Sequence, residues 1–262
     1  MPDFRPIDEN LRAAMRFFGE ATGTGEIRVA EGAQMVYSGL DYGVFNIGFL
    51  DGIAATERTL ASVLATCGRF YRERHSRWSF WLCESLLDNS VRRRSREIFA
   101  DAGMRIISQA PGMTTPAFAA PVRSLAALEV RPVRDAATRA AFAELTTICF
   151  DIPPAVAQSV YAPEGAWRGA YQGFVGYAHG RPVAIAAIVR AAGVLGIYSL
   201  GTLPEFRRRG YGEAILRTAA AKMSENATAP EPLVLESTEA GYGLYRRLGF
   251  RDTTKFTVYL TK

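Results

Sequence analysis

Glu205-Phe-Arg-Arg-Arg-Gly-Tyr-Gly-Glu213 separates two segments of different character. Before it, Val194–Leu200 is rich in β-branched and aromatic residues, which predicts a strand. After it, apolar residues recur at steps of three and four between residues 214 and 223, which predicts a helix. Because Gly201 and Pro204 break the strand, the predicted order is strand, glycine-rich turn and helix.

This turn has the features of a site for phosphate groups. The first backbone N–H groups of a helix have no acceptor within the helix, and the helix dipole is positive there. Gly210 and Gly212 carry no side chain that would keep a phosphate from those amides, and Arg207, Arg208 and Arg209 add positive charge. The turn is neither a P-loop nor a dinucleotide-binding fingerprint, since it lacks the Gly-Lys-Ser/Thr of the first and the third glycine of the second. It predicts a pyrophosphate site.

The segment that follows makes the assignment specific. Leu233–Ser237 reads as a buried strand, and Thr238 begins a short helix that ends near Gly249. Here the sequence resembles the GCN5-related N-acetyltransferase (GNAT) family. Arg207-x-x-Gly210-x-Gly212 matches the acetyl-CoA signature of that family, and Leu244-Tyr-Arg-Arg-Leu-Gly-Phe250 matches its later motif. The resemblance covers residues 128–262 well and the first half only by pattern.

Composition and pattern predict the fold class. A chain of 262 residues with 48% hydrophobic and 22% charged residues is typical of a globular protein with two domains. Predicted strands and helices alternate in the first half in the same order as after Val194. We therefore expect an α/β fold of two GNAT-like domains, each a mostly antiparallel mixed sheet flanked by helices. The expected boundaries are 1–109 for the first domain, 110–126 for a Pro- and Ala-rich linker, and 127–262 for the acetyltransferase domain.

The first half lacks the phosphate-binding features of the second. Where the second half has Arg207–Gly212, the first has Asp51–Glu57, and its two carboxylates would repel a pyrophosphate. We expect a degenerate domain that either provides a scaffold or forms one wall of the substrate cleft.

The resemblance implies acetyl-CoA as acyl-donor cosubstrate and an amine as acceptor. It implies that the backbone at Leu200 and Thr202 pairs with the pantetheine arm, with the Leu200 N–H as oxyanion donor. It also implies that the amides from Arg208 to Glu213 take the pyrophosphate. The full set of implied cofactor-binding residues is Leu200, Gly201, Thr202, Arg207, Arg208, Arg209, Gly210, Tyr211, Gly212, Glu213, Thr238, Gly241 and Tyr245.

Tyr245 is the predicted catalytic acid, together with the backbone of Leu200 as catalytic hydrogen-bond donor. A phenol with a pKa near ~10 can protonate a leaving thiolate. The alternative is that Tyr245 is a core aromatic residue whose hydroxyl only satisfies a polar group. A general base is not evident from the sequence, and Glu236 is the nearest acidic candidate.

The remaining features exclude several classes. Three cysteines and two histidines are too scattered for a disulfide framework, a metal site or a histidine-dependent nucleophile. The N-terminus has no apolar signal segment and no apolar run is long enough to span a bilayer, so a cytoplasmic protein is expected. The net charge of +5 is carried by arginine, and a solvated helix face explains the cluster at Arg92–Arg96 better than a nucleic-acid site. A homodimer is compatible with these features.

Three functions remain open. The first is acetyl transfer to a primary amine of a small molecule, which a second domain walling the cleft favours. The second is acetylation of a protein N-terminus or lysine. The third is a non-catalytic acyl-CoA sensor or scaffold, against which the presence of Tyr245 argues.

Overall fold

The computed structural model describes residues 3–225, 227 and 229–262, which form two compact units. The first unit comprises Met1–Phe4, Phe18–Gly112 and Asp252–Lys262, and the second comprises Arg5–Phe17 and Met113–Arg251. The units are therefore not two consecutive stretches of chain. The start of the first helix belongs to the second unit, and the C-terminal strand belongs to the first.

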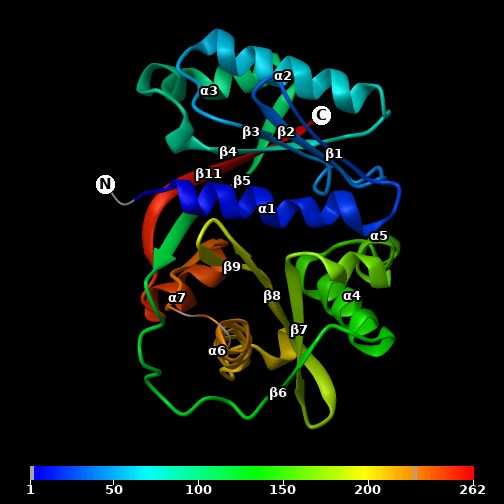
Figure 1. The fold of residues 1–262 in the computed structure, drawn as a ribbon, viewed down its shortest axis with the longest axis vertical. Helices are drawn as coiled ribbons and strands as arrows, with labels where there is room; N and C mark the ends of the chain where they lie inside the picture. Colours follow the sequence, from blue (N-terminus) through cyan, green and yellow to red (C-terminus); the bar gives the residue numbers. More distant parts are fainter. Residues whose placement is uncertain (1–2, 226, 228) are drawn as a thin grey trace. The chain divides into compact units, whose positions relative to one another are not determined.

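In the first unit the strand order is β1-β2-β3-β4-β11-β5. Its elements are β1 (Glu26–Ala30), β2 (Ala33–Tyr37), β3 (Ile47–Leu50), α2 (Glu57–Arg72), β4 (Ser79–Cys83), η1 (Glu84–Leu86), α3 (Asn89–Asp101), β5 (Met104–Thr115) up to Gly112, and β11 (Arg251–Thr261) from Asp252. β1, β2 and β3 are antiparallel neighbours, β3 and β4 are parallel, and β4 and β11 are antiparallel. The sheet is mixed, with α2 and α3 packed beside it (Figure 1).

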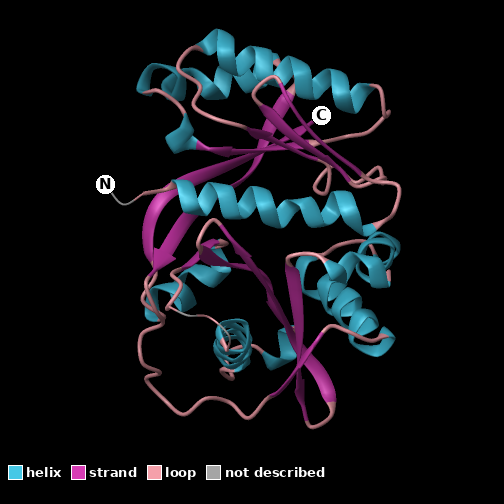
Figure 2. Ribbon diagram, viewed as in Figure 1, coloured by secondary structure: helices cyan, strands magenta, loops and turns pink. Residues whose placement is uncertain are grey.

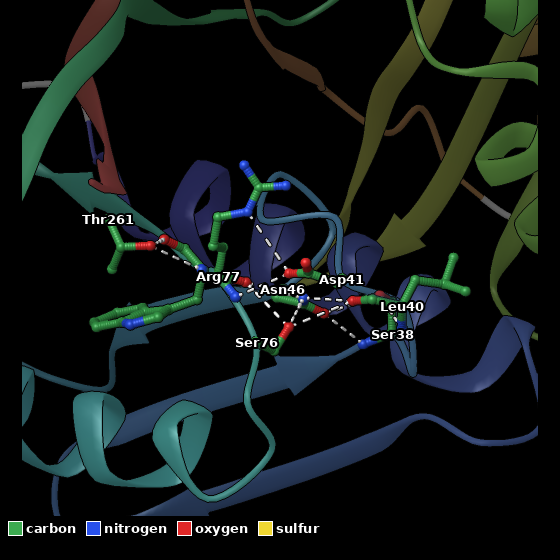
Figure 3. Close-up of polar contacts among 8 residues, drawn as sticks. Ser38, Leu40, Asp41, Asn46, Ser76, Arg77 and Thr261 are labelled. Carbon is green, nitrogen blue, oxygen red and sulfur yellow. Dashed lines mark hydrogen bonds and ion pairs between the residues drawn. The ribbon is translucent and has the colours of Figure 1, made fainter.

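Local sequence explains two features of this unit. β1 and β2 form a hairpin, and its turn residues Glu31 and Gly32 both have positive φ, as the tightest hairpin turns require. Asn46 is fully buried and links two loops: its side chain accepts from the Ser38 N–H at 2.9 Å and donates to the Arg77 carbonyl at 3.0 Å. Figure 3 shows this network, in which Arg77 also contacts Asp41.

The second unit has the strand order β10-β9-β8-β7-β6, with the last residues of β5 beside β10. Its elements are α1 (Arg5–Ala21) up to Phe17, β6 (Glu129–Pro132), α4 (Ala136–Phe150), α5 (Pro154–Tyr161), η2 (Glu164–Arg168), β7 (Tyr171–Ala178), β8 (Arg181–Ala191), β9 (Val194–Thr202), η3 (Pro204–Phe206), α6 (Tyr211–Ser224), β10 (Leu233–Glu236) and α7 (Glu239–Arg247). β6 to β9 are antiparallel, whereas β9 and β10 are parallel.

The helices of the second unit cover both faces of its sheet (Figure 2). Leu195 and Ile197 of β9 and Leu233 and Leu235 of β10 share one apolar core with residues of α6 and α7. Successive side chains of a strand point to opposite faces, so the residues between them point away from that core. On that other side, Gly196 lies against Asn10 of α1.

Local sequence also explains two features of this unit. Asp135 is the N-cap of α4, and its side chain accepts from the Thr138 N–H at 2.8 Å in a capping box. β7 and β8 form a hairpin whose turn contains Gly180, which has positive φ. The predicted mixed α/β class is confirmed.

Several boundaries differ from those predicted. β5 continues to Thr115, so the stretch from 110 to 115 of the predicted linker is strand. Glu84–Leu86 form a separate 3-10 turn, and the α-helix that follows starts only at Asn89. β11 was not predicted, because the sequence does not show that the chain end pairs with β4. This long-range pairing also places Asp252–Lys262 in the first unit.

Among the helices of the described residues, none has both the length and the apolar character needed to cross a bilayer.

Candidate functional site

The turn between β9 and α6 presents a row of backbone amides. Arg208 and Gly210 both have positive φ, 61° and 88°, and Gly210 is the N-cap of α6. Glycine adopts this conformation without the clash that a Cβ atom would cause. The first helical bond runs from the Ala214 N–H to the Gly210 carbonyl at 3.0 Å, so the amides of residues 211–213 precede the helical ladder. The backbone thus forms a concave donor surface of the kind that binds anions.

The side chains around the turn have several different partners. Arg207 donates through Nε to the Thr202 carbonyl at 3.0 Å, which fastens the turn to the end of β9. The Arg209 guanidinium lies 5.4 Å from the centre of the Phe206 ring, and the Tyr211 ring lies 6.1 Å from it. Glu213 forms an ion pair with Arg217 at 2.9 Å. In this structure the Arg207 side chain therefore bonds to the backbone of β9, and the backbone amides of residues 211–213 are the main groups that could bind an anion.

One positively charged residue near the turn was missed by the sequence analysis. The chain after β5 is held on α6 and α7: the Ala119 N–H donates to the Leu248 carbonyl at 2.9 Å, and Arg217 donates to the Ala119 carbonyl at 2.6 Å. This segment brings Arg123 so close that its Nη2 would lie 3.6 Å from a Cβ atom placed on Gly210. The only signal in the sequence was an arginine within an otherwise uncharged linker.

The sheet opens beside the turn. β9 and β10 pair at Leu233 with Leu195 and at Val234 with Gly196, and this pairing ends although both strands continue. On the other edge of β9, the register with β8 shifts between Ile185 and Ala187. Ser199 there has a φ of 46°, as an irregular strand position requires.

Leu200, Gly201 and Thr202 lie directly after this irregularity. Gly201 and Thr202 pair with Ile185 and Ala184 of β8. A Cβ atom on Gly201 would lie 2.9 Å from that of Cys149 of α4, so this glycine allows α4 to approach the strand closely. Leu200, Gly201 and Thr202 lie beyond the last residue pair between β9 and β10, so β10 does not pair with them. An extended ligand arm that pairs with β9 needs such an unpaired strand edge.

Tyr245 lies in α7 and is 7% exposed. Its ring packs edge-on to Phe250 at 5.8 Å, and its Cε2 would lie 2.8 Å from a Cβ atom on Gly241. Because Gly241 has no side chain, the Tyr245 ring can pack directly against the backbone of α7. Thr238 is the N-cap of the same helix and accepts from the Gly241 N–H at 3.2 Å. Burial, followed by the nearby Glu236 carboxyl, raises the pKa of Tyr245 well above its usual value.

Glu236 ends β10 close to this tyrosine. Its Oε1 atom is buried without a hydrogen-bond partner within the described part of the chain. Burial, with a further contribution from Asp8, raises the pKa of Glu236 to about 8. Tyr198 lies near it and donates to the Asn10 Oδ1 at 2.7 Å.

The structure brings the predicted site residues together in one unit. All thirteen belong to β9, the following turn, the start of α6, and α7. They form three groups: Arg207–Glu213 at the anion-binding turn, Leu200–Thr202 at the sheet opening, and Thr238, Gly241 and Tyr245 at α7 and its N-cap. Within the described residues, no group of three or more potential ligands could hold a metal ion.

Two hollows occur in the first unit. One, of about 370 Å³, lies at the position that corresponds to the anion-binding turn, and its lining includes the carboxylates of Glu31 and Asp51 together with the guanidinium of Arg58. The other, of about 1250 Å³, lies along α2 and α3 and is lined by several arginines, among them Arg58 and Arg72.

The comparison with known protein families identifies the second unit. Residues 169–252 match the family model of an acetyltransferase (GNAT) domain, and this range contains the strands β7 to β10, the turn, α6 and α7. Over residues 169–252 the chain is similar to GNAT domains. This range contains all thirteen predicted site residues, whereas α1 and Arg123 lie outside it.

Solved structures share the fold over nearly the whole chain. A GCN5-related N-acetyltransferase from Kribbella flavida is 19% identical, with a TM-score of 0.71 over 98% of this chain and 94% of that one. A GCN5-related N-acetyltransferase from Sphaerobacter thermophilus is 13% identical, with a TM-score of 0.60 over 100% of this chain and 93% of that one. A functionally unknown conserved protein from Staphylococcus epidermidis is 14% identical, with a TM-score of 0.64 over 90% and 94%. No curated protein matches the sequence.

The GNAT domain supports acyl-CoA-dependent acetyl transfer in general, with acetyl-CoA as cosubstrate and a separate acceptor.

Proposed function

We propose that the protein is an N-acetyltransferase that transfers the acetyl group of acetyl-CoA to a primary amine of a small molecule. The observation that carries the proposal is the position of the anion-binding turn beside the opening between β9 and β10. A ligand with a pyrophosphate and an extended arm requires both features together. The cytoplasmic location and a homodimer remain predictions from the sequence.

The residues of the turn fit the phosphate groups of acetyl-CoA. Gly210 gives the backbone its left-handed conformation, the amides of residues 211–213 precede the helical ladder, and Arg123 adds a nearby guanidinium. The first turn of α6 also carries the positive end of the helix dipole. These groups would hold the phosphates, while Arg207 would keep the turn fixed to Thr202.

The residues at the opening fit the reacting end. Acetyl-CoA supplies an acetyl group already activated as a thioester. The protein therefore has to align the amine, stabilise negative charge on the carbonyl oxygen, and move protons. We assign the charge stabilisation to the Leu200 N–H and the protonation of the departing sulfur to the Tyr245 hydroxyl. A phenol kept protonated by its buried position is suited to this second role.

The first unit contributes no second acetyl-CoA site in this proposal. The hollow at Asp51 and Glu31 has these two carboxylates and Arg58 in its lining, so an anion there would meet opposing charges. One acetyl-CoA should therefore bind per chain. We assign the first unit a scaffolding or substrate-binding role.

Calorimetric titration with acetyl-CoA tests the cofactor assignment. We expect one site per chain, and we expect its loss in Gly210→Asp, because the new carboxylate would face the phosphates. Gly193→Asp is the matched control, since Gly193 also has positive φ (72°) but lies in the open β8–β9 turn. Equal binding by both variants, or two sites per chain, would contradict the assignment.

A screen for released CoA thiol tests the acceptor class. The probes are spermidine, tyramine, kanamycin and a peptide with a free N-terminus and a lysine. Release with one of the three small amines supports the proposal, whereas release with the peptide alone makes the protein a protein acetyltransferase. Tight acetyl-CoA binding without release for any probe would favour a non-catalytic acyl-CoA sensor.

A further inference from the structure

The first helix contributes buried polar side chains to the acetyltransferase unit. Asp8 and Asn10 of α1 are 3% and 0% exposed, and both belong to the second unit. Asn10 donates to the carbonyls of Val189 and Ala191 at 3.1 and 3.0 Å, which closes the β8–β9 hairpin onto the helix. Because α1 precedes residues 169–252, these contacts are an addition to the GNAT domain.

Glu236 lies on the same side of the sheet as α1. Leu233 and Leu235 of β10 belong to the core formed with α6 and α7, so the alternation of the strand turns Glu236 toward the other face. Asp8 of α1 and Tyr198 of β9 both interact electrostatically with it. Glu236 also lies two residues beyond the last β9–β10 pair, at the opening itself. The residue is half-buried, and its Oε1 has no partner within the described residues.

We propose that Glu236 accepts the proton of the acceptor amine, and that Asp8 of α1 sets the affinity of Glu236 for that proton. Asp8 is in this view a positioning residue, which acts only through Glu236. The inference rests on the proposed function, since it concerns the same reaction.

The proton transfers balance in this scheme. An amine in neutral water is mostly an ammonium ion, and its nitrogen can form a bond only after it has lost a proton. Glu236 takes this proton, the nitrogen forms the new C–N bond, and the C–S bond breaks with its electron pair on sulfur. Tyr245 gives its proton to the sulfur. After the C–N bond has formed, the nitrogen loses its second proton through water to the Tyr245 phenolate, and Glu236 releases the first proton to the solvent, so both side chains return to their starting states.

The charges around Glu236 suit a base that works near neutral pH. Burial raises its pKa to about 8, and the negative charge of Asp8 adds to the effect. Arg12 shares an ion pair with Asp8 at 3.0 Å, which offsets part of that charge. The other titratable groups near Glu236 are the phenols of Tyr198 and Tyr245, which stay neutral because burial raises their pKa values. A carboxylate whose pKa lies near the working pH is both available and strong enough as a base.

A titration of the free protein tests the coupling without any ligand. The protein is labelled with ¹³C in the glutamate side-chain carboxyls, and Glu236→Gln assigns the Glu236 signal by its loss. We expect this carboxyl to titrate near pH 8 and to shift down by about one pH unit in Asp8→Asn. Glu9→Gln is the control, because Glu9 is the exposed neighbour of Asp8 on α1. A Glu236 carboxyl that titrates near 4.5, or that does not respond to Asp8→Asn, would overturn the proposal.

The pH dependence of turnover tests the catalytic role. The assay uses whichever of spermidine, tyramine or kanamycin releases CoA fastest. We expect Glu236→Gln to lower turnover by about 10² to 10⁴-fold with unchanged acetyl-CoA affinity, and Asp8→Asn to move the acidic limb to lower pH. Turnover close to that of the unmodified protein in Glu236→Gln would remove Glu236 from the reaction while leaving the acetyltransferase function intact. If none of the amines causes release of CoA, the proposed function is refuted instead. In that case the carboxyl titration still decides whether Asp8 and Glu236 are coupled.

Discussion

Gly196→Ala tests how α1 is attached to the rest of the second unit. Gly196 lies in the middle of β9, where any Cβ atom would overlap the Oδ1 atom of Asn10 and lie 2.7 Å from Cε2 of Tyr198. Asn10 is fully buried and packed against the β8–β9 hairpin, so it has to leave its position. The smallest possible side chain at position 196 should therefore break the whole set of Asn10 hydrogen bonds.

The cost follows from the bonds that Asn10 makes. Its amide nitrogen lies near the carbonyls of Val189, Ala191 and Val194, at 3.1, 3.0 and 3.3 Å, but it has only two hydrogens to donate. Its oxygen accepts from the Tyr198 hydroxyl at 2.7 Å. Three buried hydrogen bonds at about 1 kcal/mol each give a loss of about 3 kcal/mol. For a unit of this size, that loss corresponds to a fall in Tm of about 6 to 12 °C.

Calorimetric melting of four proteins forms the assay: the unmodified chain, Gly196→Ala, Asn10→Ala and the double variant. Asn10→Ala should lose about the same stability, and adding Gly196→Ala to it should cost little more, because the obstructing side chain is already gone. Gly165→Ala is the control, since a Cβ atom there would meet no other atom within 4 Å. Additive losses in the double variant, or a Gly196→Ala protein as stable as the control, would refute the reasoning.

Three further predictions concern the site. Arg123→Ala should weaken acetyl-CoA binding about tenfold, and this effect should decrease as salt is added, whereas the control Arg93→Ala on the exposed face of α3 should leave the affinity unchanged. Calorimetry at two salt concentrations measures both variants, and equal affinities would remove Arg123 from the phosphate site. Tyr245→Phe should lower turnover at least tenfold with little change in acetyl-CoA affinity, and full activity in the variant would make Tyr245 a core residue only. Because burial raises the pKa of Tyr245, its hydroxyl in the unmodified protein should stay protonated to above about pH 10. Glu236 binds its proton more tightly in the folded state than in the unfolded chain, so its contribution to stability is complete below pH 4.5 and is lost as the pH rises through about 8. Between pH 5 and 9, the Tm of Glu236→Gln should therefore rise relative to that of the unmodified chain. Parallel plots of Tm against pH would contradict the raised pKa.

Much of the site was predictable because its chemistry is local in sequence. The anion-binding turn depends on Gly210 at the start of α6, where the backbone takes a left-handed conformation that glycine adopts easily. The place of Tyr245 beside Gly241 is also local, since both belong to one short helix. Arg123 and Asp8 could not be assigned in this way. Their neighbours at the site are more than eighty residues away along the chain, and neither has a motif around it.

By itself, the sequence determined the order of most strands and helices, the glycine-rich turn between β9 and α6, and the acidic residues at the corresponding position in the first unit. Periodicity, glycine positions and charge act over a few residues, and they are therefore visible in the letters. Only the tertiary structure decided that β11 pairs with β4, that α1 delivers Asp8 and Asn10 to the second unit, and that the Oε1 atom of Glu236 has no hydrogen-bond partner among the described residues. These features arise from contacts between distant segments, whose pairing depends on how the whole chain buries its apolar surface.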